Sequence, residues 1–209
     1  RSAAFRAEAP GAQVHFFAAL DGSDVDAGID ALKRIADRGL AIGVKFFIGG
    51  TTGVGASGGE AVLERVLAEV DLPVAVHAED EAVIQAAMAS LQTPSAREAF
   101  FAYHEASRPV AAALAAVESG LRAVARVGGR LHLCHLSSRA ELAAGQAAVA
   151  TPGRASSGRA SSVSLEICPH HAAFSVDERA SLAEGRSSAF LKVNPPIRHE
   201  IERLALEAA

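Results

Sequence analysis

The sequence has little of what several protein classes depend on. Its 209 residues include two cysteines, one tyrosine, one methionine and no tryptophan. Two cysteines without a Cys-x-x-Cys pair exclude a disulfide framework and predict a reduced, cytoplasmic setting. No apolar run approaches the roughly 18 residues that span a bilayer, and no signal-peptide pattern opens the chain. The formal charge is −4 with acids and bases interspersed, so the sequence predicts neither a membrane nor a nucleic-acid partner.

What the sequence has is alanine and a regular alternation of elements. Half of the residues are apolar, enough for one domain with a substantial core. Strand-like runs at 13–20, 41–48, 72–77, 130–135 and 163–168 alternate with helix-like segments. This alternation predicts an α/β fold with a parallel sheet and crossover helices over residues 1–209.

Local signals mark the starts of several predicted helices. Ser23 or Asp24 is the expected cap of the first one, and Ser57 with Glu60 forms a predicted capping box for the next. A further helix is expected to open at 93–94, where proline follows threonine. The segment 152–162 contains a tandem Gly-Arg-Ala-Ser-Ser repeat, which predicts a flexible loop on the face opposite an active site.

Three of the strand-like runs end in side chains that can hold a metal. These are Lys45, His77 and His135. A lysine is a poor ligand while protonated, but a buried neutral amine can react with carbon dioxide to form a carbamate that bridges two ions. Strand alternation puts His132 and His135 on opposite faces. We therefore expect His135 to face the barrel interior and His132 to face the surrounding helices.

Five segments, in order, resemble the cyclic amidohydrolases, and among them dihydroorotase most closely. They are Gly-Val-Lys-Phe-Phe-Ile-Gly-Gly-Thr-Thr-Gly (43–53), His-Ala-Glu-Asp (77–80), His-Leu-Cys-His-Leu-Ser-Ser (132–138), Cys-Pro-His-His (168–171) and Lys-Val-Asn-Pro-Pro-Ile-Arg (192–198). The resemblance covers nearly the whole chain. It implies a (β/α)8 TIM-type metal-dependent hydrolase barrel, present here as about strands 3 to 7 with their helices.

The resemblance also implies a chemistry. Lys45, carboxylated by carbon dioxide, would bind zinc with His77 and His135, while Asn194 and His171 would bind the substrate. Family members open a small cyclic amide with a metal-activated water, or close it in reverse during pyrimidine biosynthesis. The family's first-strand His-x-His pair and eighth-strand aspartate do not occur in this sequence. No catalytic residue is therefore visible, and we expect a central portion of a barrel that is inactive alone.

Alternatives stay open at this point. Lys45 and His77 could be ordinary strand-end residues, the Asn194 segment a stiff turn, and Arg198 either an anion contact or a solvated charge. His170 could line the pocket in place of His171. Allantoinase and dihydropyrimidinase (hydantoinase) are rival activities. A non-catalytic subunit that scaffolds aspartate transcarbamoylase is a rival of another class, and a homo-oligomer is equally compatible.

Overall fold

A computed structural model describes residues 14–20, 22–49, 57–91, 100–151, 153–178 and 192–209. The helix start expected at 93–94, residues 50–53 of the glycine-rich segment and residue 13 of the first expected strand lie outside these ranges. Within them, no helix has both the length and the apolar character needed to cross a membrane.

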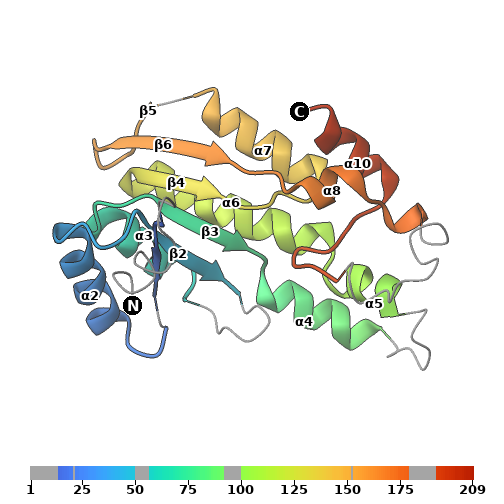
Figure 1. The fold of residues 1–209 in the computed structure, drawn as a ribbon, viewed down its shortest axis with the longest axis horizontal. Coiled ribbons are helices and arrows are strands. Elements are labelled where there is room, and N and C mark those ends of the chain that lie inside the picture. Colours follow the sequence, from blue (N-terminus) through green and yellow to red (C-terminus); the bar gives the residue numbers. More distant parts are fainter. Residues whose placement is uncertain (1–13, 21, 50–56, 92–99, 152, 179–191) are drawn as a thin grey trace.

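A six-stranded sheet forms the centre of the structure, in the order β1-β2-β3-β4-β6-β5 (Figure 1). Its strands are β1 (Phe17–Ala19), β2 (Gly43–Ile48), β3 (Val74–Ala78), β4 (Gly129–Leu133), β5 (Gly153–Arg154) and β6 (Ala160–Leu165). Every neighbouring pair is parallel except β5 with β6. The predicted parallel α/β sheet is therefore confirmed.

Helices connect the parallel strands. They are α2 (Val25–Asp37), α3 (Glu60–Glu69), α4 (Glu81–Ser90), α5 (Phe100–Ser107), α6 (Val110–Val127), α7 (Arg139–Val149), α8 (Pro169–Ala173) and α10 (Glu200–Glu207), with the 3₁₀ turn η2 (Val176–Glu178). Of these, α3, α6 and α7 pack against the sheet. Asp24, Asp80 and Ser138 cap three of these helices through side-chain oxygens that accept backbone N–H groups. In Figure 1, α4, α5 and α8 gather beyond the carboxyl ends of the strands.

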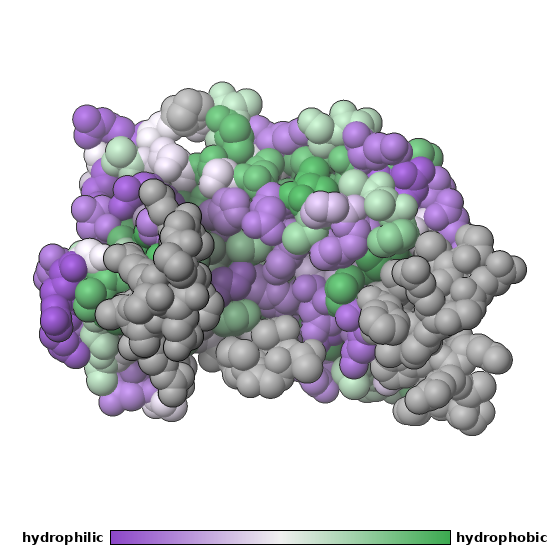
Figure 2. Space-filling model, viewed as in Figure 1, coloured by the Kyte–Doolittle hydropathy of each residue, from purple (hydrophilic) through white to green (hydrophobic). Residues whose placement is uncertain are grey.

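The two faces of the sheet differ in chemistry because side chains alternate along each strand. Val44 and Phe46 of β2 belong to the main hydrophobic core, as do Leu131 and Leu133 of β4. Gly120 of α6 lies against both leucines. The other face carries polar side chains, and Figure 2 shows hydrophilic residues across the middle of the molecule in the view of Figure 1. This polar face is where a barrel of this type would have its interior.

Two local expectations were wrong. Ser57 does not cap α3, whose N-cap is Gly59 without a side-chain hydrogen bond. The Ser57 hydroxyl instead accepts the Phe47 N–H at 3.2 Å and donates to the Leu20 carbonyl at 3.0 Å, which ties two neighbouring strands together. Glu60 pairs with Arg122 on α6.

The Gly/Arg/Ser segment expected to be a loop is partly a hairpin. Residues 153–154 pair antiparallel with 160–161, and β6 continues from there to Leu165. Arg154 and Arg159 of this segment line a hollow of about 590 Å³, together with Gly129 at the start of β4. The hairpin therefore lies at the amino-terminal ends of the strands, away from the metal-binding candidates.

Candidate metal centre

Strand register places the predicted ligands on one face of the sheet. Lys45 of β2 is paired with Ala75, Ala75 with His132, and His132 with Ser164, so these four residues form one row across four strands. His77 is paired with Phe47, two positions further along. Because Phe47 and Lys45 are two positions apart on β2, Lys45 and His77 point to the same face of the sheet, at the carboxyl side of the strands.

The structure brings His77 and His135 into direct contact. Nδ1 of His77 lies 3.1 Å from Nε2 of His135, and the rings meet edge to face with centroids 4.9 Å apart. Two imidazole ligands of one tetrahedral zinc ion, each about 2.0–2.1 Å from the metal, have nitrogens about 3.3–3.4 Å apart. The observed spacing therefore fits a pair of nitrogens directed at one shared cation.

His135 is held in the form that binds metals. Burial, reinforced by the nearby His77 and Lys45 charges, lowers the pKa of His135 to about 3. The ring is therefore neutral at physiological pH, as a ligand must be. Its Nδ1 is buried and has no hydrogen-bond partner among the described residues.

Sequence reasoning missed the group that orients His77. Glu79 is fully buried, and its Oε2 lies 3.2 Å from Nε2 of His77. The same carboxylate accepts a hydrogen bond from Arg108, at the junction between α5 and α6. A carboxylate on the far nitrogen is the usual partner of a metal-binding histidine, since it fixes the tautomer and the ring orientation. In this structure the contact between Glu79 and His77 is a close approach and not a hydrogen bond, because Nε2 of His77 has no hydrogen-bond partner among the described residues, and Nδ1 is the nitrogen that faces His135.

Lys45 lies on the same face as the two histidines, with neighbours of low polarity. Its Nζ donates to the Cys134 thiol at 3.1 Å and sits 5.4 Å from the centre of the Phe47 ring. No carboxylate of the described residues forms an ion pair with it.

The expectation that His132 faces the helices was wrong. His132 is on the polar face, with Nδ1 2.9 Å from the Ser164 hydroxyl and Nε2 3.3 Å from Glu166. The parity argument failed because β4 ends at Leu133 and His135 has a φ of +42°, in the left-handed region. This turn breaks the alternation, so both histidines reach the same side.

Two buried histidines contact the backbone of the loop that carries Asn194. His171, 3% exposed, places Nε2 3.0 Å from the Pro195 carbonyl, and His104 places Nε2 2.9 Å from the Val193 carbonyl. The peptide bond between Asn194 and Pro195 is cis. The histidines therefore position the backbone on both sides of Asn194.

Arg198 anchors the end of this loop and fits neither of the two readings of it from sequence. It is 3% exposed, donates from Nε to the Ser137 hydroxyl at 3.2 Å, and donates from Nη1 to the Arg108 carbonyl. Ser137 and Ser138 in turn donate to Glu141, a buried carboxylate whose pKa is raised by burial. Arg198 is thus a buried structural cation.

The relatives of this chain share the architecture that carries these residues. An allantoinase from Rubrobacter xylanophilus is 33% identical over 202 residues, which are 92% of this chain and 40% of the relative. A dihydroorotase from Methanosarcina acetivorans is 29% identical over 185 residues, which are 86% of this chain and 37% of the relative. No protein-family model matches the sequence.

A solved structure gives the same picture of the fold. The L-hydantoinase of Arthrobacter aurescens superposes with a TM-score of 0.74 at 22% identity, over 92% of this chain and 40% of that one. The chain is similar to part of an allantoinase, a dihydroorotase and a hydantoinase. It spans about 40% of the length of the relatives it matches, and its sheet is part of a TIM-type barrel.

Proposed function

We propose that Lys45, His77 and His135 are metal ligands of a zinc-dependent dihydroorotase, an enzyme that interconverts N-carbamoyl-L-aspartate and dihydroorotate. One observation carries the proposal: two ring nitrogens lie 3.1 Å apart at the carboxyl ends of adjacent parallel strands. Active sites of TIM-type barrels lie at this end. Lys45, carboxylated by carbon dioxide, completes the set from the neighbouring strand.

The chain's own residues prepare this centre for its ions. The Glu79 carboxylate lies 3.2 Å from the far nitrogen of His77, and Nδ1 of the same ring faces His135. Burial keeps His135 neutral and therefore available as a ligand. When bound, the zinc ions would activate a water molecule and polarise the ring carbonyl of the substrate.

Asn194 and His171 are the proposed substrate-binding residues. The amide of Asn194 can both donate and accept hydrogen bonds, as a cyclic ureide or its ring-opened form requires. His171 supports it through the Pro195 carbonyl. Arg198 fixes the far end of the same loop through Ser137 and the Arg108 backbone. A rigid loop of this kind orients a polar ring over the metal ligands.

Allantoinase and hydantoinase are the alternatives within the same chemistry. The allantoinase relative, at 33% identity, favours the first, and the segment Cys-Pro-His at 168–170 resembles that branch. The Lys-Val-Asn segment at 192–194 and the dihydroorotase relatives favour dihydroorotase. The close pairing of His77 with His135 argues against a non-catalytic scaffold for aspartate transcarbamoylase, because a scaffold has no need of ligand geometry. A homo-oligomer and a cytoplasmic setting remain predictions.

Metal content and substrate preference together test the proposal. The chain is purified with zinc and bicarbonate, and its metal is measured by inductively coupled plasma mass spectrometry beside His77→Ala and an exposed control, His15→Gln. A lower zinc content per chain in the first variant than in the second supports the ligand assignment, and equal zinc content in both refutes it. Hydrolysis of dihydroorotate, allantoin and dihydrouracil by the product of the whole reading frame then selects the substrate. A preference for either of the last two would overturn the dihydroorotase assignment.

A further inference from the structure

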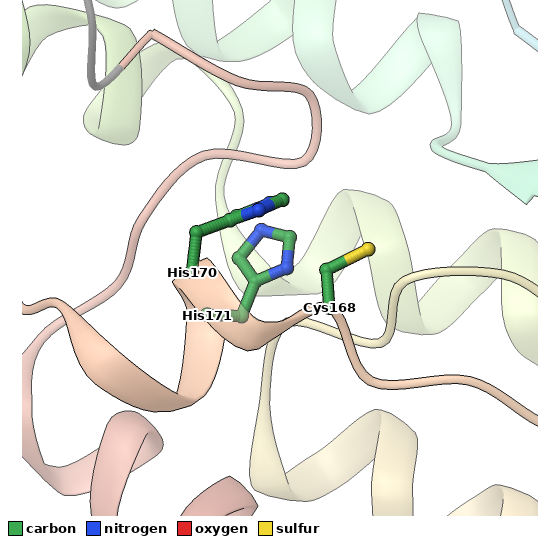
Figure 3. A group of neighbouring side chains, drawn as sticks. All are labelled: Cys168, His170 and His171. Carbon is green, nitrogen blue, oxygen red and sulfur yellow. The ribbon is translucent and has the colours of Figure 1, made fainter.

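A second group of metal-binding side chains lies at the start of α8, apart from the pair just described. Cys168, His170 and His171 each offer a ligand atom, and these atoms all lie within 4.8 Å of one another. Figure 3 shows the three side chains extending to the same side of the chain, with the His171 ring next to the thiol of Cys168. The rings of His170 and His171 have centroids 4.3 Å apart.

His171 carries the strongest sign that this group binds something. Its ring is 3% exposed, and its Nε2 is engaged with the Pro195 carbonyl. Because a carbonyl only accepts, Nε2 must carry the proton and Nδ1 must carry a lone pair. That Nδ1 is buried and has no hydrogen-bond partner in the described part of the chain. Metal-binding histidines typically donate their other ring nitrogen to a backbone carbonyl in this way.

A neighbouring group of side chains is a weaker candidate for a metal site. His132, Cys134 and Glu166 are also close together, and since Cys168 of the α8 group itself donates to Glu166 Oε1 at 3.3 Å, the two groups differ in their histidines and not in their thiols. His132 contacts Ser164 and Glu166, and Cys134 accepts from Lys45. A buried acceptor without a partner is expensive, whereas a paired group is not. The group at α8 is therefore the better candidate.

We propose that Cys168 Sγ, His170 and Nδ1 of His171 bind a divalent transition metal of the zinc and cobalt class. Thiolate and imidazole suit such borderline-soft ions. Ligand atoms about 3.3–3.8 Å apart would surround a tetrahedral ion, which side-chain rotations reach from the observed spacing. On binding, the S–H bond of Cys168 breaks, a sulfur–metal bond forms and the proton passes to solvent. This site shares no ligand with the centre at His77 and His135 and does not rest on the proposed function, although an ion on Nδ1 of His171 would leave direct contact with a substrate to Asn194.

Cobalt titration separates the two centres, because a thiolate ligand gives a sulfur-to-cobalt charge-transfer band in the near ultraviolet. The Lys45, His77 and His135 set contains no sulfur and gives none. The apo chain is titrated with Co²⁺ beside Cys168→Ser and a matched control, Cys134→Ser. We expect the band in the unaltered chain and in Cys134→Ser, and its complete loss in Cys168→Ser. His170→Ala should keep the thiolate but weaken Co²⁺ binding by about tenfold or more.

Each other outcome overturns the proposal. The proposal is wrong if the band is absent from an unaltered chain that circular dichroism shows to be folded. It is also wrong if Cys168→Ser retains the band, or if only Cys134→Ser loses it. The band must also persist in His77→Ala, because its loss there would show that the cobalt bound by the thiolate depends on the histidine pair and that the two sites are not separate. Failure of dihydroorotate hydrolysis leaves the cobalt result unaffected, so the two proposals fail separately.

Discussion

Acid is expected to destabilise this chain through His171, which folding buries in its neutral form. Burial lowers the pKa of His171 from 6.5 to about 4, and its side chain is 3% exposed. Between these two values the unfolded chain binds a proton that the folded chain does not. The free energy of unfolding must therefore fall as the pH drops from about 6.5 to about 4.

The size of the effect follows from the shift. One pKa unit corresponds to about 1.4 kcal/mol, so a shift of about 2.5 units, from 6.5 to about 4, is worth about 3.4 kcal/mol once complete. At pH 5 most of the unfolded chains carry the proton and few of the folded ones do, which gives a loss of about 2 kcal/mol relative to neutral pH. The lowered pKa of His135 acts in the same direction. The test therefore compares the unaltered chain with a variant that lacks only the titrating side chain of His171.

Urea denaturation at pH 7.5 and pH 5, with a chelator present, measures this loss in the unaltered chain and in His171→Gln. Glutamine can still donate to the Pro195 carbonyl but does not titrate, so its loss should be smaller by about 2 kcal/mol. His15→Gln, at an exposed histidine, should behave like the unaltered chain. Equal losses in His171→Gln and the unaltered chain would refute the reasoning.

Three further changes test the packing and the metal ligands. Gly49→Ala should lower the free energy of unfolding by more than about 2 kcal/mol, because φ is +79° and the new methyl group would meet a backbone carbonyl oxygen at 2.1 Å. Gly39→Ala, with φ of +59° and open space, should cost only about 1 to 2 kcal/mol in the same urea assay, and equal costs would contradict the clash. Arg198→Met should cost about 3 kcal/mol in that assay, against under about 1 kcal/mol for the exposed Arg122→Met, and a similar cost for both would show that the buried network adds nothing. Lys45→Ala should abolish binuclear zinc binding in the product of the whole reading frame, measured by mass spectrometry, and two tightly bound metals per chain in that variant would rule it out as a ligand.

Sequence periodicity was sufficient to predict the parallel α/β architecture and the position of part of the candidate site. Strand-like runs predicted that Lys45 and His77 lie near the ends of two strands, and the register of β2 with β3 places them on one face. The same rule failed after β4, where His135 adopts a φ of +42°. Nothing in the local sequence signals a left-handed histidine, since only glycine and asparagine mark that conformation strongly. The error lay where a strand becomes a loop, and that is where functional residues concentrate.

Long-range pairings were beyond the reach of local pattern. Glu79 is bound by Arg108, 29 positions along the chain, and Arg198 reaches Ser137 across 61 positions. A charged residue in sequence looks solvated until its partner is known, because burial of a charge is tolerated only with compensation. Ser57 likewise resembles a helix cap but ties two strands together. Such residues are recognised by what surrounds them in space.

Arg108 connects the proposed metal centre to the loop that carries Asn194. Its guanidinium holds Glu79 behind His77, and its backbone carbonyl receives the Arg198 side chain that ends the Asn194 loop. One residue at the junction of two helices therefore contacts both the carboxylate beside His77, a proposed metal ligand, and the side chain that ends the Asn194 loop. Filling the metal site would stiffen the support on which the loop rests, and by thermodynamic reciprocity an ordered loop would raise metal affinity by the same factor. We therefore expect metal binding and substrate binding to strengthen each other in the complete protein.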